Sequence, residues 1–291
     1  MEPRRLAPYA RLSPTLLQKD LFEKTILITG GGYGVGASIA TSFAEARVRA
    51  IILLGRTESK LKASAQSLSS RFADIDVSYF KADVTSKDDV KGVFGTLKER
   101  NIVPDILVNN AGYLSERGDF VQADLDEYWE SFNTNVLGTI LVTQAFLQHR
   151  RATISTSSSA AAAAKSAVVI TLNTVGAYTV HVPGLSAYGA SKAAIARWSE
   201  LIADDVPATE ARFVSVHPGY VKTDMAAKSG LEGVFEPTEA KLAGDFVVWL
   251  TGEEAGFLNG RFVWANWDVD ELVQRKGEIV QKDLLRGGLV A

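Results

Sequence analysis

Short runs of β-branched and aliphatic residues alternate along this chain with longer stretches of helical pattern, and this alternation constrains the fold more than any other feature. Strands that alternate with helices form βαβ units, whose parallel sheet is covered by helices on both faces. The predicted fold class is therefore α/β, with a doubly wound parallel sheet. The seven predicted strands are Thr25–Thr29, Ala50–Leu54, Val77–Lys81, Ile106–Asn109, Ala167–Leu172, Arg212–His217 and Gly260–Trp264.

The helical stretches between these runs are long enough to cross back over a sheet. No fixed-period repeat and no linker divides them, so we predict a single domain over residues 23–265, an N-terminal arm over residues 1–22 and a C-terminal appendage over residues 266–291. Asp268 stands where it could cap a helix in that appendage. The Ser/Ala-rich segment Thr153–Lys165 is predicted to be an extended surface loop. The predicted helices are Gly34–Ala46, Thr57–Ser70, Lys87–Arg100, Asp126–His149, Ser186–Ile202 and Thr238–Leu250.

Charge and composition narrow the classes of partner. The formal net charge of -3 leaves no broad positive field for nucleic acid or an anionic membrane. The chain has no cysteine, and His149, His181 and His217 lack metal-site spacing, so they are predicted to be structural. Residues 1–20 contain no apolar run of signal-peptide length. We expect a cytoplasmic protein with no metal and no nucleic-acid or membrane partner.

The first predicted strand leads into a glycine-rich turn, in the segment TILITGGGYGVG over residues 25–36. Glycine tolerates positive φ and lets backbone N–H groups approach a pyrophosphate, while the following helix directs its positive end at the same charge. The segment lacks G-x-G-x-x-G but matches T-G-x-x-x-G-x-G, which predicts a Rossmann-type dinucleotide site, although such a turn can also be a plain tight connection. The predicted contacts are Thr29, Gly30, Tyr33, Gly34, Val35 and Gly36.

The second predicted strand ends at Gly55 and Arg56, where NAD-preferring sites commonly carry an acid for the ribose 2′-hydroxyl. No acid stands at Gly55, and the planar donors of Arg56 suit a 2′-phosphate. The predicted cofactor is therefore NADP(H). Arg56 could also be a solvated residue at a strand end, and Glu58 could weaken its positive field.

Further motifs follow along the chain. Asn109-Asn110-Ala111-Gly112 comes after the fourth predicted strand, and Tyr188-Gly-Ala-Ser-Lys192 lies further on. With these motifs the chain resembles the short-chain dehydrogenase/reductase family from Lys24 to about Trp264. The motifs, in family order, are TGGGYGVG, Ala82-Asp83-Val84, NNAG, NTNVLG with Asn135, YGASK, and PGYVKT from Pro218.

The resemblance implies a role for each matching residue. Tyr188 and Lys192 would carry the proton chemistry and contact the cofactor, with Lys192 binding the ribose hydroxyls. Asn135 would hold a water beneath the lysine, giving protons a path to solvent, although it could also simply pack within its helix. The implied cofactor contacts are Asp83 and Val84 at the adenine, Asn110 and Gly112 along the ribose and nicotinamide, and Val221 and Thr223 at the carboxamide.

The spacing of Tyr188 and Lys192 agrees with this role, because residues four apart on a helix share one face. A free tyrosine has a pKa near 10, and a neighbouring ammonium is expected to lower that pKa and make the phenol a usable acid and base. In reduction, Tyr188 would protonate the substrate oxygen as hydride reaches the carbonyl carbon. Oxidation reverses each step.

The chain departs from the family at the residue that hydrogen-bonds the substrate oxygen, usually a serine thirteen residues before the tyrosine. Here that position is Val175, which has no hydroxyl, whereas alignment of the strand places Thr174 there with one residue inserted. We assign the role to Thr174, with Asn173 as the fallback. Residues 226–237 correspond to the mobile substrate lid of relatives. The predicted pocket residues are Tyr113, Leu114, Tyr178, His181 and Met225.

These observations predict an NADP(H)-dependent oxidoreductase that acts on a carbonyl or secondary alcohol of a small, largely apolar substrate. The alternative is a non-catalytic NADPH-binding regulator or scaffold with the same fold. A third possibility is epimerisation or dehydration through a transient keto intermediate. By analogy with relatives, the two long helices at Asp126–His149 and Ser186–Ile202 would pack against their copies in a homodimer or homotetramer.

Overall fold

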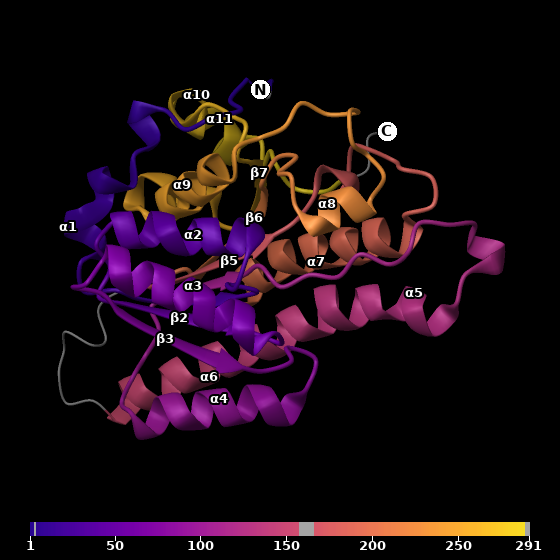
Figure 1. The fold of residues 1–291 in the computed structure, drawn as a ribbon. Coiled ribbons are helices and arrows are strands. Elements are labelled where there is room, and N and C mark those ends of the chain that lie inside the picture. The colour runs from indigo at the N-terminus through magenta and orange to yellow at the C-terminus, as the bar shows by residue number, and fades with distance from the viewer. Residues whose placement is uncertain (3, 157–165, 289–291) are drawn as a thin grey trace.

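A computed structural model describes residues 1–2, 4–156 and 166–288 of the chain. Over these residues, seven strands form one parallel sheet in the order β3-β2-β1-β4-β5-β6-β7 (Figure 1). This arrangement confirms the predicted single-domain, doubly wound α/β fold. The strands are β1 Thr25–Thr29, β2 Ala50–Gly55, β3 Asp76–Lys81, β4 Ile106–Asn109, β5 Ala167–Leu172, β6 Ala211–His217 and β7 Arg261–Trp264.

Helices cover both faces of the sheet, each over its own apolar core (Figure 1). Strand residues alternate between the two cores: Ile26 and Ile28 belong to one, and Leu27 belongs to the other. This alternation explains why β1 is apolar throughout. On the first face lie α2 Gly34–Glu45, α3 Glu58–Arg71 and α9 Ala240–Thr251, and on the second lie α4 Lys87–Glu99, α6 Thr139–Thr156 and α7 Ser186–Asp205.

The helix predicted over Asp126–His149 is not one regular helix. The structure has α5 over Leu125–Phe132, then the π-helical turn η4 over Asn133–Gly138, and then α6. At Gly138 a Cβ atom would lie 2.7 Å from Cγ2 of Val84, so the turn brings the helix too close to Val84 for any side chain.

The prediction of an extended loop from Thr153 was also wrong at its beginning. Helix α6 continues through Thr156. Within it, the hydroxyl of Thr153 donates to the main-chain oxygen of His149, four residues earlier, at 2.9 Å. Residues 157–165 of the predicted loop lie outside the described residues.

The first and last parts of the chain lie against each other beside α9 (Figure 1). Arg11 forms ion pairs with Glu254 and Asp270, at 2.6 and 2.8 Å. Oδ1 of Asp268 accepts hydrogen bonds from two main-chain N–H groups and so caps the helix that follows it. The remaining elements are η1 Ala10–Leu12, η2 Pro14–Leu17, α1 Gln18–Leu21, η3 Phe120–Gln122, η5 Val175–Ala177, α8 Asp224–Lys228, η6 Glu253–Leu258, α10 Val269–Gln274 and α11 Lys276–Gln281.

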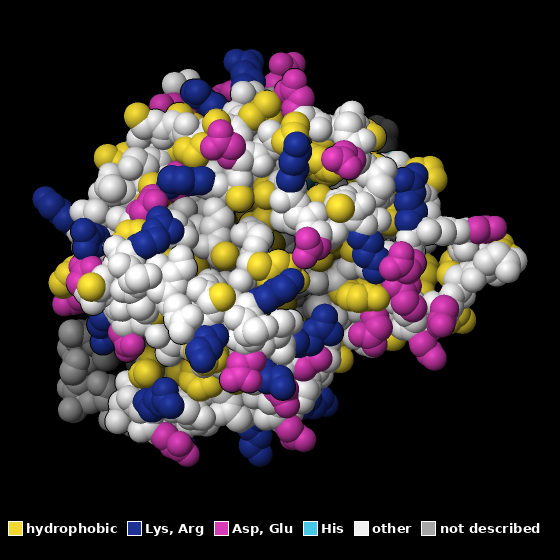
Figure 2. All heavy atoms as spheres, in the orientation of Figure 1, with side chains coloured by type: hydrophobic (Ala, Val, Ile, Leu, Met, Phe, Trp, Pro, Cys, Tyr) yellow, Lys and Arg dark blue, Asp and Glu magenta, His cyan; other side chains and the backbone are white. Residues whose placement is uncertain are grey.

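Basic and acidic side chains are interspersed over the face seen in Figure 2, and neither sign forms a continuous field there. Among the described residues, no helix is both long enough and apolar enough to cross a membrane.

The strand order reverses at β1, which pairs with β2 on one side and with β4 on the other. In open parallel sheets the loops at the carboxyl ends of two such strands separate and leave a crevice where ligands bind. The motif residues in loops follow the carboxyl ends of β1, β2, β3, β4, β5 and β6, so the topology collects them at one edge of the sheet. Asn135 lies in η4, and Tyr188 and Lys192 lie on α7.

Candidate active site

The glycine turn after β1 adopts a conformation that favours glycine. Gly30 and Gly34 have φ values of +66° and +58°. A Cβ atom on Gly36 would lie 2.3 Å from the main-chain oxygen of Gly30, so the helix packs directly on the turn. The side-chain amide of Asn110 donates to the main-chain oxygens of Thr29 and Gly30, both at 3.0 Å, and supports the turn from the neighbouring strand.

The hydroxyl of Thr29 joins the two sides of the crevice, because it accepts hydrogen bonds from the main-chain N–H groups of Asn110 and Ala111, both at 3.0 Å. Helix α2 begins after Tyr33, whose side chain makes no capping hydrogen bond. The first N–H groups of α2 therefore remain available to an anion, and the helix dipole favours one at this position. The turn thus fits the pyrophosphate of a dinucleotide.

Arg56 follows β2, and 60% of its side-chain surface is exposed. One of its terminal nitrogens lies 4.0 Å from a carboxylate oxygen of Asp83, which follows β3. The other oxygen of Asp83 accepts from the main-chain N–H and the hydroxyl of Thr85, at 2.9 and 2.8 Å. Asp83 is thus held by its own loop, and the Arg56 guanidinium extends into solvent at the edge of the crevice.

Tyr188 and Lys192 lie on α7, as their spacing predicts. The ammonium of Lys192 is 5.9 Å from the centre of the Tyr188 ring and donates to the main-chain oxygen of Leu172 at 2.8 Å. Lys192 is only 5% exposed, and burial lowers its pKa from 10.5 to about 8.

The expected fall in the pKa of Tyr188 is not what the structure shows. Burial raises the pKa of the Tyr188 phenol to about 12, and hydrogen bonding to the Thr174 side chain offsets only part of this rise. Burial destabilises the phenolate more than the hydrogen bond from Thr174 stabilises it. The Lys192 ammonium bonds to the main-chain oxygen of Leu172 and not to the phenol oxygen. Tyr188 is therefore protonated at neutral pH.

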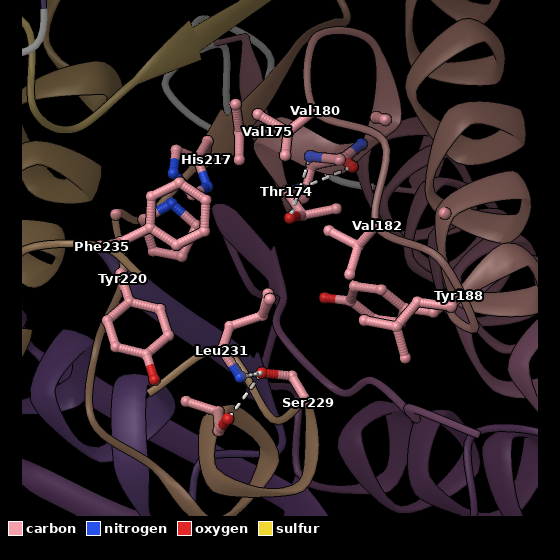
Figure 3. A pocket seen from close by; sticks show the side chains of 18 of the residues that line it. Thr174, Val175, Val180, Val182, Tyr188, His217, Tyr220, Ser229, Leu231 and Phe235 are labelled. Atoms are coloured by element: carbon pink, nitrogen blue, oxygen red, sulfur yellow. Dashed lines mark hydrogen bonds between the residues drawn. The ribbon is translucent and has the colours of Figure 1, made fainter. Parts of the chain in front are cut away.

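Thr174 follows β5 and faces the same cavity as Tyr188 (Figure 3). Its hydroxyl accepts from the main-chain N–H of Gly176 at 3.3 Å and retains a hydrogen to donate. The fallback residue, Asn173, uses its amide N–H groups on the Lys192 main-chain oxygen and the Ser215 hydroxyl, at 3.2 and 3.1 Å. The structure thus brings Thr174 rather than Asn173 to the phenol.

Asn135 lies in the π-helical turn η4 and joins three segments of the site. Its amide nitrogen donates to the main-chain oxygen of Tyr113 and to the hydroxyl of Ser191, both at 2.9 Å, and its oxygen accepts from the Tyr113 main-chain N–H. A Cβ atom on Gly112 would lie 3.6 Å from the Lys192 ammonium, which is ordinary contact distance and shows that this loop lies beside the lysine. Asn135 thereby fixes the loop after β4 next to Lys192.

A cavity of about 950 Å³ opens beside Tyr188 and Thr174, with a mainly apolar lining. Of the predicted pocket residues, Leu114, His181 and Met225 line it. Tyr113 and Tyr178 do not, because their hydroxyls bond to Glu127 and Glu200, at 2.8 and 2.9 Å, and hold the rings elsewhere. The predicted cofactor residues Val35, Val221 and Thr223 also line the cavity, which connects it to the crevice.

The segment after α8 forms one side of this cavity (Figure 3). Ser229 and Leu231 line it, and Arg117 reaches the segment through the main-chain oxygens of Ser229 and Gly230, at 3.4 and 3.3 Å. Arg117 also donates to the main-chain oxygen of Pro183 at 3.1 Å on the opposite side of the opening. These bonds join the predicted lid to the loop before α7.

Several lining residues were missed by the sequence analysis, among them Leu6, Trp264 and His217, whereas Phe235 belongs to the predicted lid. His217 was predicted to be structural, but its ring lines the cavity. A signal was present, because His217 is the last residue of a predicted strand and the carboxyl ends of such strands face the ligand. Trp264 ends a predicted strand in the same way, and Leu6 carried no motif.

Comparisons with known proteins identify the family of the chain. A family model described as short chain dehydrogenase matches residues 24–232. The short chain dehydrogenase/reductase nsrO of Aspergillus novofumigatus is 32% identical over 272 residues, which cover 92% of this chain and 89% of that protein.

Two solved structures have similar folds. A short chain dehydrogenase from Burkholderia cenocepacia in complex with NADP is 25% identical, with a TM-score of 0.70 over 84% of this chain and 99% of that one. The NADH-dependent reductase A1-R′ complexed with NAD is 23% identical, with a TM-score of 0.71 over 86% of this chain and 97% of that one.

Proposed function

The chain belongs to the short chain dehydrogenase family, and from this premise we propose that it is an NADP(H)-dependent oxidoreductase. It transfers hydride between the nicotinamide and a carbonyl or secondary alcohol of a small, largely apolar substrate. The observation that carries this proposal is that Tyr188 and Thr174 direct hydroxyl groups into one apolar cavity, with the Lys192 ammonium buried 5.9 Å from the Tyr188 ring centre.

Tyr188 acts as the acid in reduction. Since burial raises its pKa to about 12, the phenol carries its proton at neutral pH and is ready to donate it to a carbonyl oxygen. Thr174 donates a hydrogen bond to the same oxygen and orients it. The nicotinamide, when bound, supplies the hydride to the carbonyl carbon.

Lys192 acts at the sugar next to the nicotinamide and on the charge of the phenolate. Its ammonium is fixed by Leu172 and can turn its remaining N–H groups toward a ribose hydroxyl. Asn135 supports this position through Ser191, the residue before Lys192 on α7. The proton that Tyr188 donates would be replaced from solvent, through a water that Asn135 holds beneath the Lys192 ammonium.

The preference for NADP(H) rests on Arg56. Its exposed guanidinium stands at the end of β2, where a 2′-phosphate would lie, and its neighbouring carboxylate is 4.0 Å away. Of the two solved structures above, one contains NADP and the other NAD, so Arg56 itself is the basis of the assignment.

The test is turnover by the purified protein with NADPH and a panel of aldehydes and ketones. We expect oxidation of NADPH that Tyr188→Phe abolishes. The matched control is Tyr128→Phe, because the Tyr128 hydroxyl bonds to Ser186 and does not line the cavity. Tight NADPH binding without turnover of any carbonyl or alcohol would instead support a cofactor-binding regulator.

A further inference from the structure

Residues from the start of the chain close one end of the substrate cavity. The main-chain N–H groups of Arg4 and Arg5 both donate to the main-chain oxygen of Asn266 at 3.0 Å. The side-chain amide of Asn266 donates in return to the main-chain oxygen of Arg5 at 2.7 Å and to the hydroxyl of Thr238 at 3.0 Å. These bonds place Leu6 in the cavity wall.

Three further contacts hold this segment in place. The main-chain oxygen of Leu6 accepts from the N–H of Glu239 at 2.8 Å, and Arg5 pairs with Asp268. The Arg5 guanidinium also lies 4.1 Å from the centre of the Tyr9 ring. Leu6 is thus anchored on both sides along the chain, and its side chain is a fixed part of the cavity.

Leu6 shares this part of the cavity with aromatic residues. Asn266, which is hydrogen-bonded to Arg5, lies two residues after Trp264. The Trp264 ring packs edge to face against the His217 ring, with ring centres 5.4 Å apart. Figure 3 shows His217 and Phe235 on one side of the cavity and Tyr188 on the other. We call Leu6, His217, Phe235 and Trp264 the distal subsite.

His217 brings a hydrogen-bonding ring to the distal subsite, in a cavity that Glu236, Thr238 and Asn266 also line. Over the part of the chain that the structure describes, no hydrogen bond to either ring nitrogen is found, and Nδ1 is buried. Burial lowers the pKa of His217 to about 3, so the imidazole is neutral and offers one N–H donor and one acceptor nitrogen. The imidazole therefore keeps unused hydrogen-bonding capacity beside the cavity, which a ligand hydroxyl could use.

We propose that the distal subsite recognises the end of the substrate remote from the reacting carbonyl, as a flat aromatic group that carries a hydroxyl bonded to His217. Leu6 then limits how far such a substrate extends, which makes the N-terminal arm a determinant of specificity. This inference rests on the proposed function, since the reacting carbonyl is placed at Tyr188.

Three ketones of graded length test the proposal: acetophenone, 4-acetylbiphenyl and 4-acetyl-4′-hydroxybiphenyl. Their dissociation constants are measured by isothermal titration calorimetry in the presence of NADP⁺. Leu6→Trp should weaken binding of 4-acetylbiphenyl at least about tenfold more than binding of acetophenone, because the larger side chain fills the distal end. The matched control is Leu16→Trp, which places the same ring on a side chain that is 61% exposed.

The hydroxyl is tested by the ratio of the two biphenyl dissociation constants. In the parent protein the hydroxylated ketone should bind about fivefold more tightly, the value of one hydrogen bond, and His217→Phe should reduce this ratio to about one. His217→Asn keeps a polar group and should retain part of the preference. Thermal unfolding of each variant verifies that it is folded.

The proposal would be overturned if Leu6→Trp weakened the binding of acetophenone and of 4-acetylbiphenyl equally, or if Leu16→Trp weakened the binding of 4-acetylbiphenyl as much as Leu6→Trp does. It would also be overturned if the preference for the hydroxylated ketone survived in His217→Phe. Failure of all three ketones to bind would also overturn it. Binding is measured without turnover, so these results are distinct from failure of the proposed function, which is the absence of any activity that depends on Tyr188.

Discussion

The Lys192 ammonium donates a 2.8 Å hydrogen bond to the main-chain oxygen of Leu172, the last residue of β5. The bond ties α7, which carries Tyr188, to the strand that leads directly to Thr174. The relative position of the Tyr188 phenol and the Thr174 hydroxyl therefore depends on a buried cation. This arrangement has a cost, because a charge removed from water is less stable.

Because burying the Lys192 ammonium destabilises the folded protein, we expect Lys192→Met to be more stable than the parent. A fall in pKa from 10.5 to about 8 corresponds to about 3 kcal/mol at pH 7, and the lost hydrogen bond offsets about 1 kcal/mol of the gain. Lys192→Met should abolish turnover yet unfold at a higher urea concentration than the parent. The gain in unfolding free energy should be complete below about pH 8, where Lys192 is protonated in both the folded and the unfolded protein. It should disappear as the pH approaches 10.5, where the lysine of the unfolded chain also loses its proton.

The matched control is Lys62→Met, which removes an exposed ammonium and should change the unfolding free energy by less than about 0.5 kcal/mol. A Lys192→Met variant that is less stable than the parent throughout the pH range would contradict the prediction.

The raised pKa of Tyr188 predicts different pH profiles for the two directions of reaction. Its phenol stays protonated well below about 12, so kcat/KM for reduction should be nearly constant between about pH 6 and about pH 8. Oxidation requires the phenolate, whose population rises about tenfold per pH unit over that range, and kcat/KM should rise with it. Steady-state rates with NADPH and NADP⁺ measure both; a plateau in the oxidation profile near neutral pH would show that bound cofactor lowers this pKa.

Thr174 should contribute through its hydroxyl alone. Thr174→Val keeps the shape but removes the donor to the substrate oxygen, so kcat should fall about 100-fold. Thr174→Ser keeps the donor and should remain within about tenfold of the parent. Equal losses in the two variants, measured under saturating NADPH, would show that the methyl group or the loop conformation matters instead.

Arg56 should determine the choice of cofactor. Arg56→Asp removes the donors for a 2′-phosphate and adds a repelling charge, so the affinity for NADPH should fall at least about tenfold while that for NADH does not. Fluorescence titration with both cofactors measures this change. Arg47→Asp is the charge-matched control, since Arg47 pairs with Asp74 away from the crevice. Equal affinities in the parent protein would refute the preference.

The exposed face of α5 should mediate self-association. Leu125 and Trp129 are 65% and 58% exposed on this helix, which favours burial against a second copy. We expect a homodimer or homotetramer by light scattering, and Trp129→Asp should shift it toward the monomer. Val280, which is 50% exposed on α11, provides a control through Val280→Asp. A parent protein that is monomeric at micromolar concentration would contradict this prediction.

Strands were predicted more accurately than helix ends. The predicted bounds of β1, β4 and β5 agree with the structure, because their apolar runs are buried on both faces and end at polar or glycine residues. The long helix before β5 was predicted without its π-helical turn. That turn depends on Asn135 reaching the Tyr113 main chain and on Gly138 meeting Val84, and neither contact leaves a periodic pattern.

The sequence by itself determined the family, the parallel sheet and the positions of the glycine turn, Tyr188 and Lys192, because these follow from local patterns and short spacings. The tertiary structure decided that Thr174 and not Asn173 faces the phenol, and that burial raises rather than lowers the pKa of Tyr188. It also placed Leu6 in the lining of the cavity beside Tyr188 through Arg5 and Asn266, which are 261 positions apart in the chain. Burial and contacts between distant segments arise only when the chain has folded.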